Sequence, residues 1–366
     1  MKVTRSSKTS LKFLTAKKKA VLDEIMDEYS RVVNRFIDNF WGKEYKRKDL
    51  TKEVTNQPAS WLSARMRQCA AREALGMVDG AAEAATALEK EGVKPIHTGQ
   101  KMTLSAQCVK IAEDVNSFDL WLTLTSIGRQ IKLHIPLRKH RHLNLFASWK
   151  RSTTVVIHRQ YVQFSFETKT DPKKETGRCV GIDVGINHLL ATSEGALLGD
   201  EVKRLIDNIK RKVQGSKGYK RAKKTLSYYL HKVVKQYFKT NPDLRLVVVE
   251  RLKGLKQGKG NRHKSFRQTL THWNYRELLD IIQMRCEENR VSFRSVNPYK
   301  TSQTCPTCSH IERGSRRNEK FKCLKCGFSG QADIVAALNI LRRFTSGRYG
   351  AAFQTHDGFY SFPLLE

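Results

Sequence analysis

The segment CVGIDVGINHLLATSEG, residues 179–195, decides how this sequence folds, because its residue pattern predicts two short β-strands at 179–185 and 189–193. Successive side chains of the first strand point to opposite faces: Val180, Ile182 and Val184 on one, and Gly181, Asp183 and Gly185 on the other. The two glycines clear the space on both sides of Asp183, which leaves room for a metal ion or a phosphate to approach its carboxylate. The alternative is a structural acid at a strand end or in a tight hairpin turn.

A second acid closes a buried strand further along the chain. The apolar run from Leu246 to Val249 predicts a strand at 244–250 that ends abruptly at Glu250. An acid at the carboxyl end of such a strand is typical of functional sites in α/β sheets, because the sheet holds the backbone rigid while the side chain projects into a crevice. The alternative is a salt bridge with the adjacent Arg251 or with another cation.

A third acid, Asp333, precedes an apolar run that predicts a helix at 333–343. Helical spacing places Ala336, Ala337 and Ile340 on the face of Asp333, so its carboxylate should point toward the packed side of the helix. The alternative is that Asp333 caps the amino end of this helix, since Asp is among the residues preferred there.

The three acids arrive on a first strand, a later strand and a final helix, from which Asp183, Glu250 and Asp333 can converge on one cleft. Carboxylates gathered without a counter-ion would repel one another, so Mg²⁺ or Mn²⁺ bound through oxygen ligands is the natural partner. Two such cations about 4 Å apart would activate water and stabilise the leaving oxygen of a phosphodiester. The sequence therefore predicts that these three acids are catalytic metal ligands of a phosphodiester hydrolase.

Four clustered cysteines form the sharpest local pattern, CPTC at 305–308 and CLKC at 323–326. Two CxxC pairs separated by 14 residues match a tetrahedral zinc site of four thiolates, whose ligands would be Cys305, Cys308, Cys323 and Cys326. Because no further ligand is implied, the zinc should be structural and should fold a loop that has almost no core. A redox dithiol is the alternative, and two matched pairs argue against it. The remaining four cysteines are scattered, as small core residues usually are.

The most one-sided charge lies between Lys203 and Lys239, where thirteen Lys or Arg accompany one acid, Asp207. We predict a helical stretch at 201–239 that contacts nucleic acid, because such a stretch would repel itself unless phosphates lay nearby. The candidate contact residues are Lys210, Arg211, Lys212, Lys220, Arg221, Lys223 and Lys224. The alternative is an ordinary solvated surface.

The whole chain is basic as well. Its 68 Lys and Arg against 35 Asp and Glu leave a formal net charge of +33, which favours nucleic acid as the partner and an anionic membrane less. No segment predicts a transmembrane span, and the amino terminus lacks the apolar run of a secretory signal peptide. We therefore expect the protein inside the cell, with free thiols.

The amino-terminal part changes its hydrophobic period once. Residues 15–91 predict a helical unit, with one long amphipathic helix and a second helical region that opens at Ser60 and is interrupted or bent near Gly80. From about residue 95 the period becomes two, which predicts an antiparallel sheet or barrel completed by the amino-terminal strand. The segment 171–178 is the predicted linker to the rest of the chain.

Four segments resemble, in sequence and order, the carboxy-terminal half of the transposon-encoded TnpB proteins, which are relatives of the Cas12 nucleases. They are GIDVGINHLLATSEG, VVVERLKGL, YKTSQTCPTC with CLKCG, and ADIVAALNIL. The resemblance implies a multidomain α+β protein, in which a β-barrel wedge domain with an inserted helical lobe precedes a RuvC-like α/β nuclease domain of RNase H fold with an inserted zinc ribbon. The domains would span 1–14 and 92–172 (wedge), 15–91 (helical lobe), 179–299 and 329–345 (nuclease), 300–328 (ribbon) and 346–366 (tail).

The same resemblance implies an RNA-guided DNA endonuclease of the prokaryotic cytoplasm, associated with the nucleoid. Its guide RNA would come from a transposon end, its target would be double-stranded DNA beside a short motif, and Asp183, Glu250 and Asp333 would hold the magnesium ions. The family often has Asn where this chain has Val335, so a helper role of that Asn is absent. A compact Cas12-type CRISPR effector, an RNA-guided DNA-binding regulator without cleavage and a plain nucleic-acid-binding protein are the alternatives. Monomer and dimer both stay open.

Overall fold

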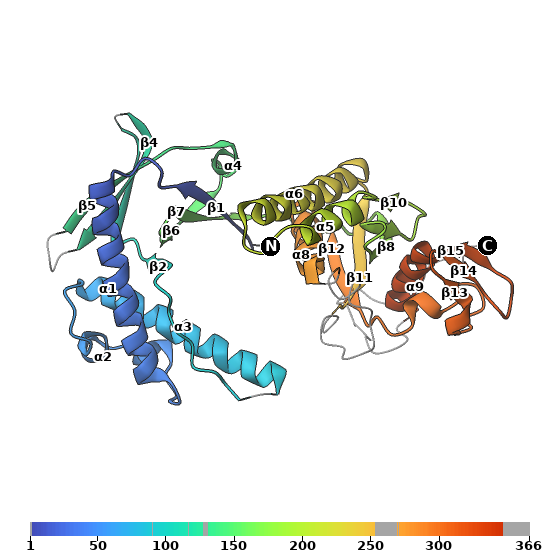
Figure 1. Cartoon of the computed structure of the whole chain (residues 1–366), viewed down its shortest axis with the longest axis horizontal. Coiled ribbons are helices and arrows are strands. Elements are labelled where there is room, and N and C mark those ends of the chain that lie inside the picture. The colour runs from blue at the N-terminus through green and yellow to red at the C-terminus, as the bar shows by residue number, and fades with distance from the viewer. Residues whose placement is uncertain are drawn as a thin grey trace. The chain divides into compact units, whose positions relative to one another are not determined.

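The computed structural model describes residues 2–89, 91–115, 117–126, 131–252, 269 and 271–346, and the chain divides into two compact units between Lys169 and Thr170 (Figure 1). Each unit has its own hydrophobic core. No described helix combines the length and the apolar character that a membrane span requires. The tail predicted at 346–366 lies outside the described residues beyond Ser346.

The first unit, Lys2–Lys169, contains three main helical segments between its first two strands. Its elements are β1 (Lys2–Ser10), α1 (Ala16–Phe40), η1 (Arg47–Asp49), α2 (Lys52–Asn56), α3 (Ala64–Leu88), β2 (Lys101–Leu104), β3 (Val109–Val115), β4 (Phe118–Ser126), β5 (Ile131–Leu137), α4 (Arg141–Asn144), β6 (Lys150–His158) and β7 (Tyr161–Lys169). The predicted insertion of a helical unit behind an amino-terminal strand is confirmed, because β1 pairs with β7 along its whole length.

Two predictions about the second long helix are wrong. Helix α3 begins at Ala64, where the Ser63 hydroxyl accepts a hydrogen bond from the Met66 backbone, so Ser63 and not Ser60 is its cap. The helix also runs without interruption through Gly80 to Leu88. Four of the five residues after this glycine are alanines, and their strong helix propensity outweighs the cost of about 1 kcal/mol for one glycine.

The strands of the first unit form two antiparallel sheets in the described residues, so the predicted barrel is not confirmed. The sheet orders are β1-β7-β6-β2 and β3-β4-β5. Alternate residues of both sheets, including Leu122, Ile135 and Val155, are buried in the same core as α1 and α3. A shared core explains why the period-two pattern looked like one continuous sheet.

The second unit, from Thr170 onward, is built on a five-stranded mixed sheet in the order β10-β9-β8-β11-β12. Strands β10, β9 and β8 are antiparallel, whereas β8, β11 and β12 are parallel. The elements of this sheet and its helices are β8 (Arg178–Val184), β9 (Leu190–Thr192), β10 (Leu197–Leu198), α5 (Val202–Lys210), α6 (Lys217–Thr240), β11 (Leu244–Glu250), α8 (Tyr275–Glu288), β12 (Ser292–Val296) and α9 (Ala332–Ser346).

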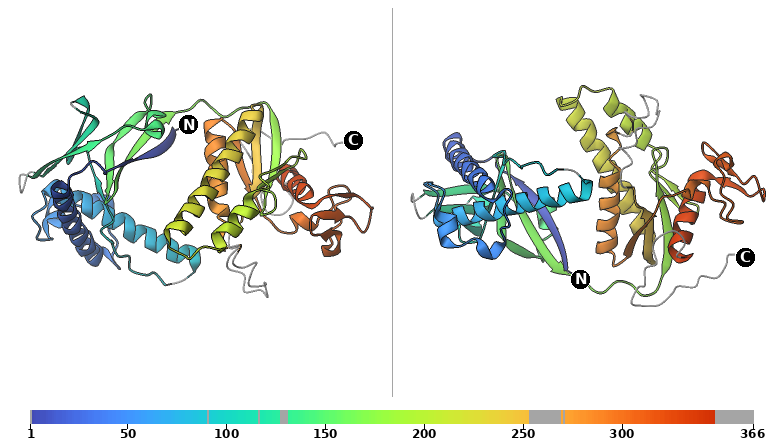
Figure 2. Two further views of the ribbon diagram at one scale, coloured as in Figure 1. Left: turned by 45° about the horizontal axis from the view of Figure 1, so that its top comes forward. Right: turned by 90° about the horizontal axis from the view of Figure 1, so that it is seen from below.

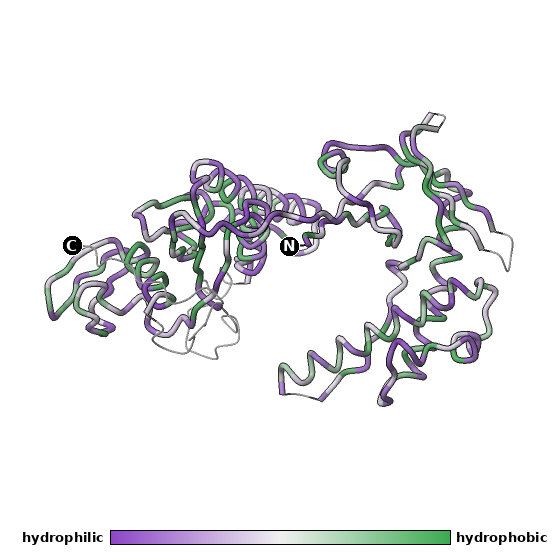
Figure 3. The backbone as a smooth tube through the Cα atoms, turned by 180° about the vertical axis from the view of Figure 1, so that it is seen from behind, coloured by the Kyte–Doolittle hydropathy of each residue, from purple (hydrophilic) through white to green (hydrophobic). Residues whose placement is uncertain are grey.

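Helices cover both faces of this sheet. Val180, Ile182 and Val247 pack against α5, α6 and α8 on one face, while Leu246 and Val248 pack against α9 on the other. Figure 2 shows α9 and α8 on opposite sides of the strands, and Figure 3 shows the hydrophobic colour along the strands in the middle of the sheet. The predicted basic helical stretch is two helices, because the chain turns at Gly215 (φ +83°) before the Ser216 hydroxyl caps α6.

The cysteine segment lies between β12 and α9 and forms a small three-stranded antiparallel sheet. Its elements are η2 (Thr301–Gln303), η3 (Arg313–Ser315), β13 (Arg316–Arg317), β14 (Lys320–Lys322) and β15 (Ser329–Gln331). Because β15 pairs with β14, this ribbon sheet extends to Gln331, three residues beyond the predicted boundary at 328. Helix α9 begins at the next residue, so the ribbon and α9 are directly joined.

Candidate metal and nucleic-acid site

Two of the three predicted acids lie side by side at one edge of the large sheet. Strands β8 and β11 are parallel neighbours, and Ile182 is paired with Val249. The next residue on each strand is therefore Asp183 and Glu250, whose side chains lean to the same face. Both strands end at this edge, where the backbone is held rigidly by the sheet.

The third acid comes from α9, which packs against β8 at Gly181. A Cβ atom on Gly181 would lie 2.2 Å from the Ala337 carbonyl oxygen and 2.9 Å from the Leu341 backbone nitrogen. The space beside Asp183 that the sequence suggested for a metal or phosphate is thus filled, on the Gly181 side, by a helix. The absence of a side chain at Gly181 lets α9 approach the strand, and α9 carries Asp333.

Asp333 is buried with Ala336, Ala337 and Ile340, as its helical spacing predicted. The capping alternative is wrong, because the side-chain oxygen of Gln331 accepts hydrogen bonds from the backbone N–H groups of Asp333 and Ile334, at 2.6 and 2.9 Å. The Asp333 carboxylate, whose side chain is 12% exposed, instead accepts a 2.7 Å hydrogen bond from Arg316 of the ribbon. The Asp333 carboxylate therefore does not cap the amino end of α9.

The charges of this cluster act on one another. Burial, followed by the negative charges of Glu250 and Asp333, raises the pKa of Asp183 to about 8, while Arg316 opposes that rise. Burial also raises the pKa of Glu250, against a hydrogen bond from Thr301 and the positive charges of Arg343 and Arg316. Because Glu250 and Asp333 disfavour the ionisation of Asp183, the three acids form one electrostatic site, which a cation would stabilise.

Sequence reasoning missed three residues that position this cluster. The Arg316 guanidinium donates a hydrogen bond to Asp333. The Thr301 hydroxyl donates a hydrogen bond to Glu250, and Arg343 and Arg316, not the adjacent Arg251, are the cations whose charges act on it among the described residues. Asn339 of α9 donates to the backbone oxygens of Thr301 and Thr304, at 2.8 and 2.6 Å. A polar residue within the apolar run of α9 was the available signal for Asn339.

Among the described residues, the four cysteines are the one group of three or more His, Cys, Asp or Glu whose ligand atoms all lie within 4.8 Å of one another. The sulfur atoms of Cys305 and Cys326 are 3.6 Å apart, as are those of Cys308 and Cys323. Tetrahedral zinc with Zn–S bonds of about 2.3 Å requires sulfur separations of about 3.8 Å. The backbone N–H of Cys326 and then that of Lys325 lower the pKa of Cys323 to about 6, which favours the thiolate that zinc binds. The residues fit zinc.

The carboxylate oxygens of Asp183, Glu250 and Asp333 do not all lie within the 4.8 Å that encloses the four cysteine sulfur atoms. A pair of Mg²⁺ ions separated by about 4 Å needs a wider frame of carboxylates than one zinc ion does, with ligands that serve different ions. The acids offer oxygen ligands at the end of a rigid sheet, and the charges of Glu250 and Asp333 disfavour ionisation of Asp183. Their chemistry fits hard divalent cations.

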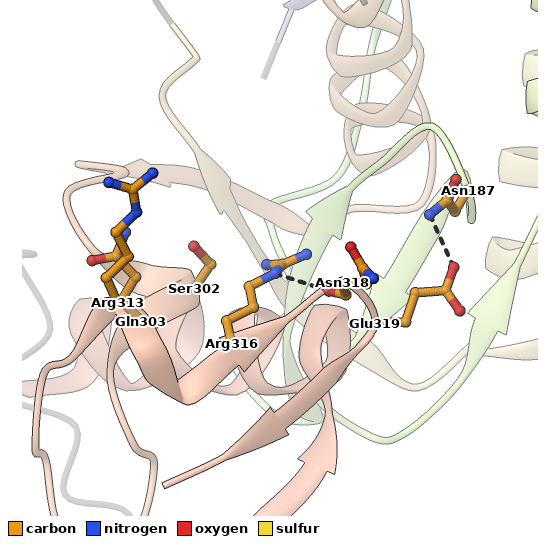
Figure 4. Close-up of a pocket in the computed structure, with 7 residues that line it drawn as sticks. All are labelled: Asn187, Ser302, Gln303, Arg313, Arg316, Asn318 and Glu319. Carbon is orange, nitrogen blue, oxygen red and sulfur yellow. Dashed lines mark hydrogen bonds between the residues drawn. The ribbon is translucent and has the colours of Figure 1, made fainter. Parts of the chain in front are cut away.

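A polar pocket of about 450 Å³ lies where the ribbon faces the loop between β8 and β9 (Figure 4). Arg316 lines it together with Arg313, Asn318 and Glu319 of the ribbon and Asn187 of the loop. A 2.9 Å hydrogen bond from Asn187 to Glu319 joins the two sides. Arg316 thus lines the pocket and also contacts Asp333 of the acid cluster.

The predicted basic contacts lie around the turn between α5 and α6. Five of the seven side chains are exposed without a carboxylate partner in the described residues, namely Lys212, Lys220, Arg221, Lys223 and Lys224. Lys210 is ion-paired with Asp207 at 2.9 Å, and Arg211 donates to the backbone oxygen of Asp207. Lys210 and Arg211 are thus already engaged with Asp207, whereas the other five predicted contact residues are not.

Comparison with known proteins identifies relatives of one kind. A family model described as the Cas12f1-like TNB domain matches residues 275–340. The TnpB-like protein MJ0751 of Methanocaldococcus jannaschii is 28% identical over 127 residues, which are 34% of this chain and 44% of that protein. The putative transposase MJ0856.1 of the same organism is 31% identical over 83 residues, 19% of this chain and 72% of that protein.

The CRISPR-associated endodeoxyribonuclease Cas12f1 of Sulfoacidibacillus thermotolerans is 38% identical over 72 residues, 19% of this chain and 17% of that protein. The matches thus span less than half the length of MJ0751 and of Cas12f1. In fold, the chain is similar to Cas12f1 in its complex with single-guide RNA and target DNA, with a TM-score of 0.55, 13% identity, and coverage of 89% of this chain and 83% of that one. The mini-RNA-guided endonuclease Casφ3 gives a TM-score of 0.58 at 12% identity, with 93% and 92% covered.

Proposed function

Because the chain belongs to the family of the TnpB proteins and their Cas12 relatives, we propose that it is an RNA-guided DNA endonuclease. One observation carries the proposal: Asp183, Glu250 and Asp333 gather at one edge of a sheet, where the charges of Glu250 and Asp333 help to raise the pKa of Asp183. Acids gathered in this way disfavour the ionisation of Asp183 unless a cation is bound, so their presence in a chain of net charge +33 favours a functional role.

The strand order supports assigning the second unit to a RuvC-like nuclease domain of RNase H fold. Three antiparallel strands followed by two parallel ones, with acids at the ends of β8 and β11, suit that assignment. The ribbon would be its inserted zinc ribbon, with Cys305, Cys308, Cys323 and Cys326 as ligands. The first unit, with two antiparallel sheets and three helical segments, would be the wedge domain and its helical lobe.

The chain's own residues would prepare the site for hydrolysis. Asp183, Glu250 and Asp333 would hold two Mg²⁺ or Mn²⁺ ions, which supply an activated water and stabilise the leaving oxygen when bound. The hydrogen bond from Thr301 fixes the orientation of Glu250. Arg316 shares its positive charge with Asp333 from the ribbon side, so the ribbon balances part of the cluster's negative charge.

The zinc ribbon would act on this site through its rigidity. A folded ribbon sheet holds Arg316 on β13 and delivers the chain directly to α9 and Asp333. Asn339 ties α9 to the segment that carries Thr301, which contacts Glu250. Zinc would therefore stabilise the relative positions of two of the three acids without taking part in the chemistry.

Guide RNA and target DNA are the proposed partners, with sequence read by base pairing and the protein contacting the phosphate backbone. The exposed cations Lys212, Lys220, Arg221, Lys223 and Lys224, with Lys210 and Arg211 beside them, would form one backbone contact. The guide would come from a transposon end and the protein would work in the prokaryotic cytoplasm, associated with the nucleoid.

The test is cleavage by the Asp183→Ala variant. We expect it to abolish Mg²⁺-dependent cutting of DNA matched to the copurified RNA while RNA binding stays. Thermal stability without metal should not be lowered, because the variant removes an acid whose ionisation its surroundings disfavour. Asp280→Ala is the matched control, since Asp280 is an exposed acid on α8 outside the cluster. Undiminished cutting by Asp183→Ala would overturn the assignment, and matched binding without any cutting by the wild type would favour a regulator.

A further inference from the structure

The pocket between the ribbon and the β8–β9 loop is built from polar groups that the proposed acid cluster does not use. It measures about 450 Å³, which is within the range of small-ligand sites. In Figure 4, Arg313 and Gln303 lie on one side, Glu319 and Asn187 on the other, and Arg316 and Asn318 between them. The pocket therefore has a cationic end and an amide and carboxylate end.

Several of these groups have unused hydrogen-bonding capacity. The Arg313 side chain has no carboxylate partner in the described residues, because the neighbouring Glu312 pairs with His310 at 2.9 Å. The side-chain amides of Gln303 and Asn318 likewise form no hydrogen bond to any described residue, and each offers a donor and an acceptor. One free cation and two free amides at the wall of one pocket point to a ligand with both an anionic and a base-like part.

The turn that presents Asn318 is built for that residue. Asn318 has a φ of +54°, a conformation that Asn adopts more readily than most residues. The Arg316 side chain donates to the Asn318 backbone oxygen at 3.3 Å, and the Ala332 backbone donates to that of Glu319 at 2.8 Å. These hydrogen bonds to the backbone oxygens of Asn318 and Glu319 fix the turn without using the Asn318 side-chain amide, which lines the pocket.

The position of the pocket links it to the acids. Arg316 lines the pocket and also donates to the Asp333 carboxylate at 2.7 Å. A strand whose phosphodiester lies at the acid cluster would therefore extend past Arg316 into this space. The pocket walls come from the ribbon, η2 and the β8–β9 loop, so all three would contact the same nucleotide.

We propose that this pocket binds one unpaired nucleotide of the DNA strand that is cut, adjacent to the cleaved phosphodiester, and reads its base. The proposal rests on the function proposed above. Arg313 binds the phosphate of that nucleotide, and the amides of Gln303 and Asn318 bind the base edge. Asn and Gln amides pair best with the adjacent donor and acceptor of adenine, so adenine is the preferred base.

The first experiment measures the base composition beside the cut. Wild-type protein with its copurified RNA cuts a matched DNA pool that is randomised around the cut region, in Mg²⁺, and the cut ends are sequenced. We expect adenine to be enriched at one fixed position by about fivefold or more, the lower range for one good amide contact. Gln303→Ala and Asn318→Gly should flatten this enrichment among the cuts that these variants still make. Glycine is chosen at 318 because it accepts the positive φ.

A second readout does not depend on cutting. The inactive Asp183→Ala variant is cross-linked by ultraviolet light to a short single strand containing adenine, and the attached peptide is mapped. We expect attachment within residues 302–319 and a loss of yield in Arg313→Gln. Arg317→Gln is the matched control, because Arg317 is an exposed cation on β13 that does not line the pocket.

The outcomes separate the two proposals. Cutting without any base enrichment beside the cut, or an enrichment that survives both amide variants, overturns the pocket and leaves the nuclease intact. If the wild type does not cut in Mg²⁺, the nuclease proposal fails, and the cross-link alone decides whether the pocket holds a nucleotide. Attachment elsewhere, or equal losses in Arg313→Gln and Arg317→Gln, also overturns the pocket.

Discussion

Replacing Gly181 by alanine tests whether the close packing of α9 on β8 builds the acid cluster. The new Cβ would lie 2.2 Å from the Ala337 carbonyl oxygen and 2.9 Å from both the backbone nitrogen and the Cβ of Leu341. All three atoms belong to α9, and two are backbone atoms, so a rotamer change cannot relieve the contact. Restoring an ordinary separation requires α9 to retreat by about 1 Å.

That retreat has two consequences of different size. Overpacking at a buried position costs about 1–3 kcal/mol of folding free energy. Because Asp333 moves with α9 while Asp183 stays on β8, the same shift also misplaces one proposed metal ligand by about 1 Å, which can lower a rate about a hundredfold. Gly181→Ala should therefore lose activity far beyond the fraction of molecules that unfold.

The assay pairs a metal-dependent cleavage rate with a denaturant unfolding curve. Gly80→Ala is the matched control, since nothing lies within 4 Å of a Cβ at that exposed position in α3. It should raise the unfolding free energy by up to about 1 kcal/mol and leave cleavage unchanged. If Gly181→Ala cuts at the wild-type rate, the packing of α9 on β8 does not determine the geometry of the cluster.

Two further predictions concern stability. The Glu73 side chain is 6% exposed and accepts hydrogen bonds from Tyr29 and Thr103. Burial alone would raise the pKa of Glu73, but the neighbouring His97 and Lys101 lower this pKa to about 2. Because the pKa of Glu73 in the folded protein lies below the ordinary 4.5, ionised Glu73 stabilises the folded state fully above pH 4.5. This contribution to the unfolding free energy, about 3 kcal/mol, is lost as the pH falls toward 2. The stability difference between wild type and Glu73→Gln, from unfolding curves between pH 7 and pH 3.5, should shrink accordingly; a constant difference would refute the shift. Cys308→Ser should abolish the bound zinc measured by elemental analysis and unfold the ribbon, whereas Cys179→Ser outside the ribbon keeps the zinc; full zinc in Cys308→Ser would refute the four-thiolate site.

The local sequence was sufficient to predict an element or a cluster where its formation depends on residues close together in the chain. The alternation in β8, the apolar run of β11 and the spacing of the four cysteines each predicted a strand or a side-chain cluster that the structure contains. Strand periodicity and short CxxC spacings are set by backbone geometry over a few residues, so they can be read without knowing the fold.

Contacts between distant segments were decided by the tertiary structure alone. Arg316 reaches Asp333 because the ribbon sheet folds back onto α9, Asn339 joins α9 to the Thr301 segment, and Gly181 is small because a helix carbonyl approaches it. The sequence could only suggest space for a ligand beside Asp183. The sequence of β8 shows that Gly181 has no side chain. Which atoms occupy the resulting space depends on packing between elements far apart in the chain, here β8 and α9.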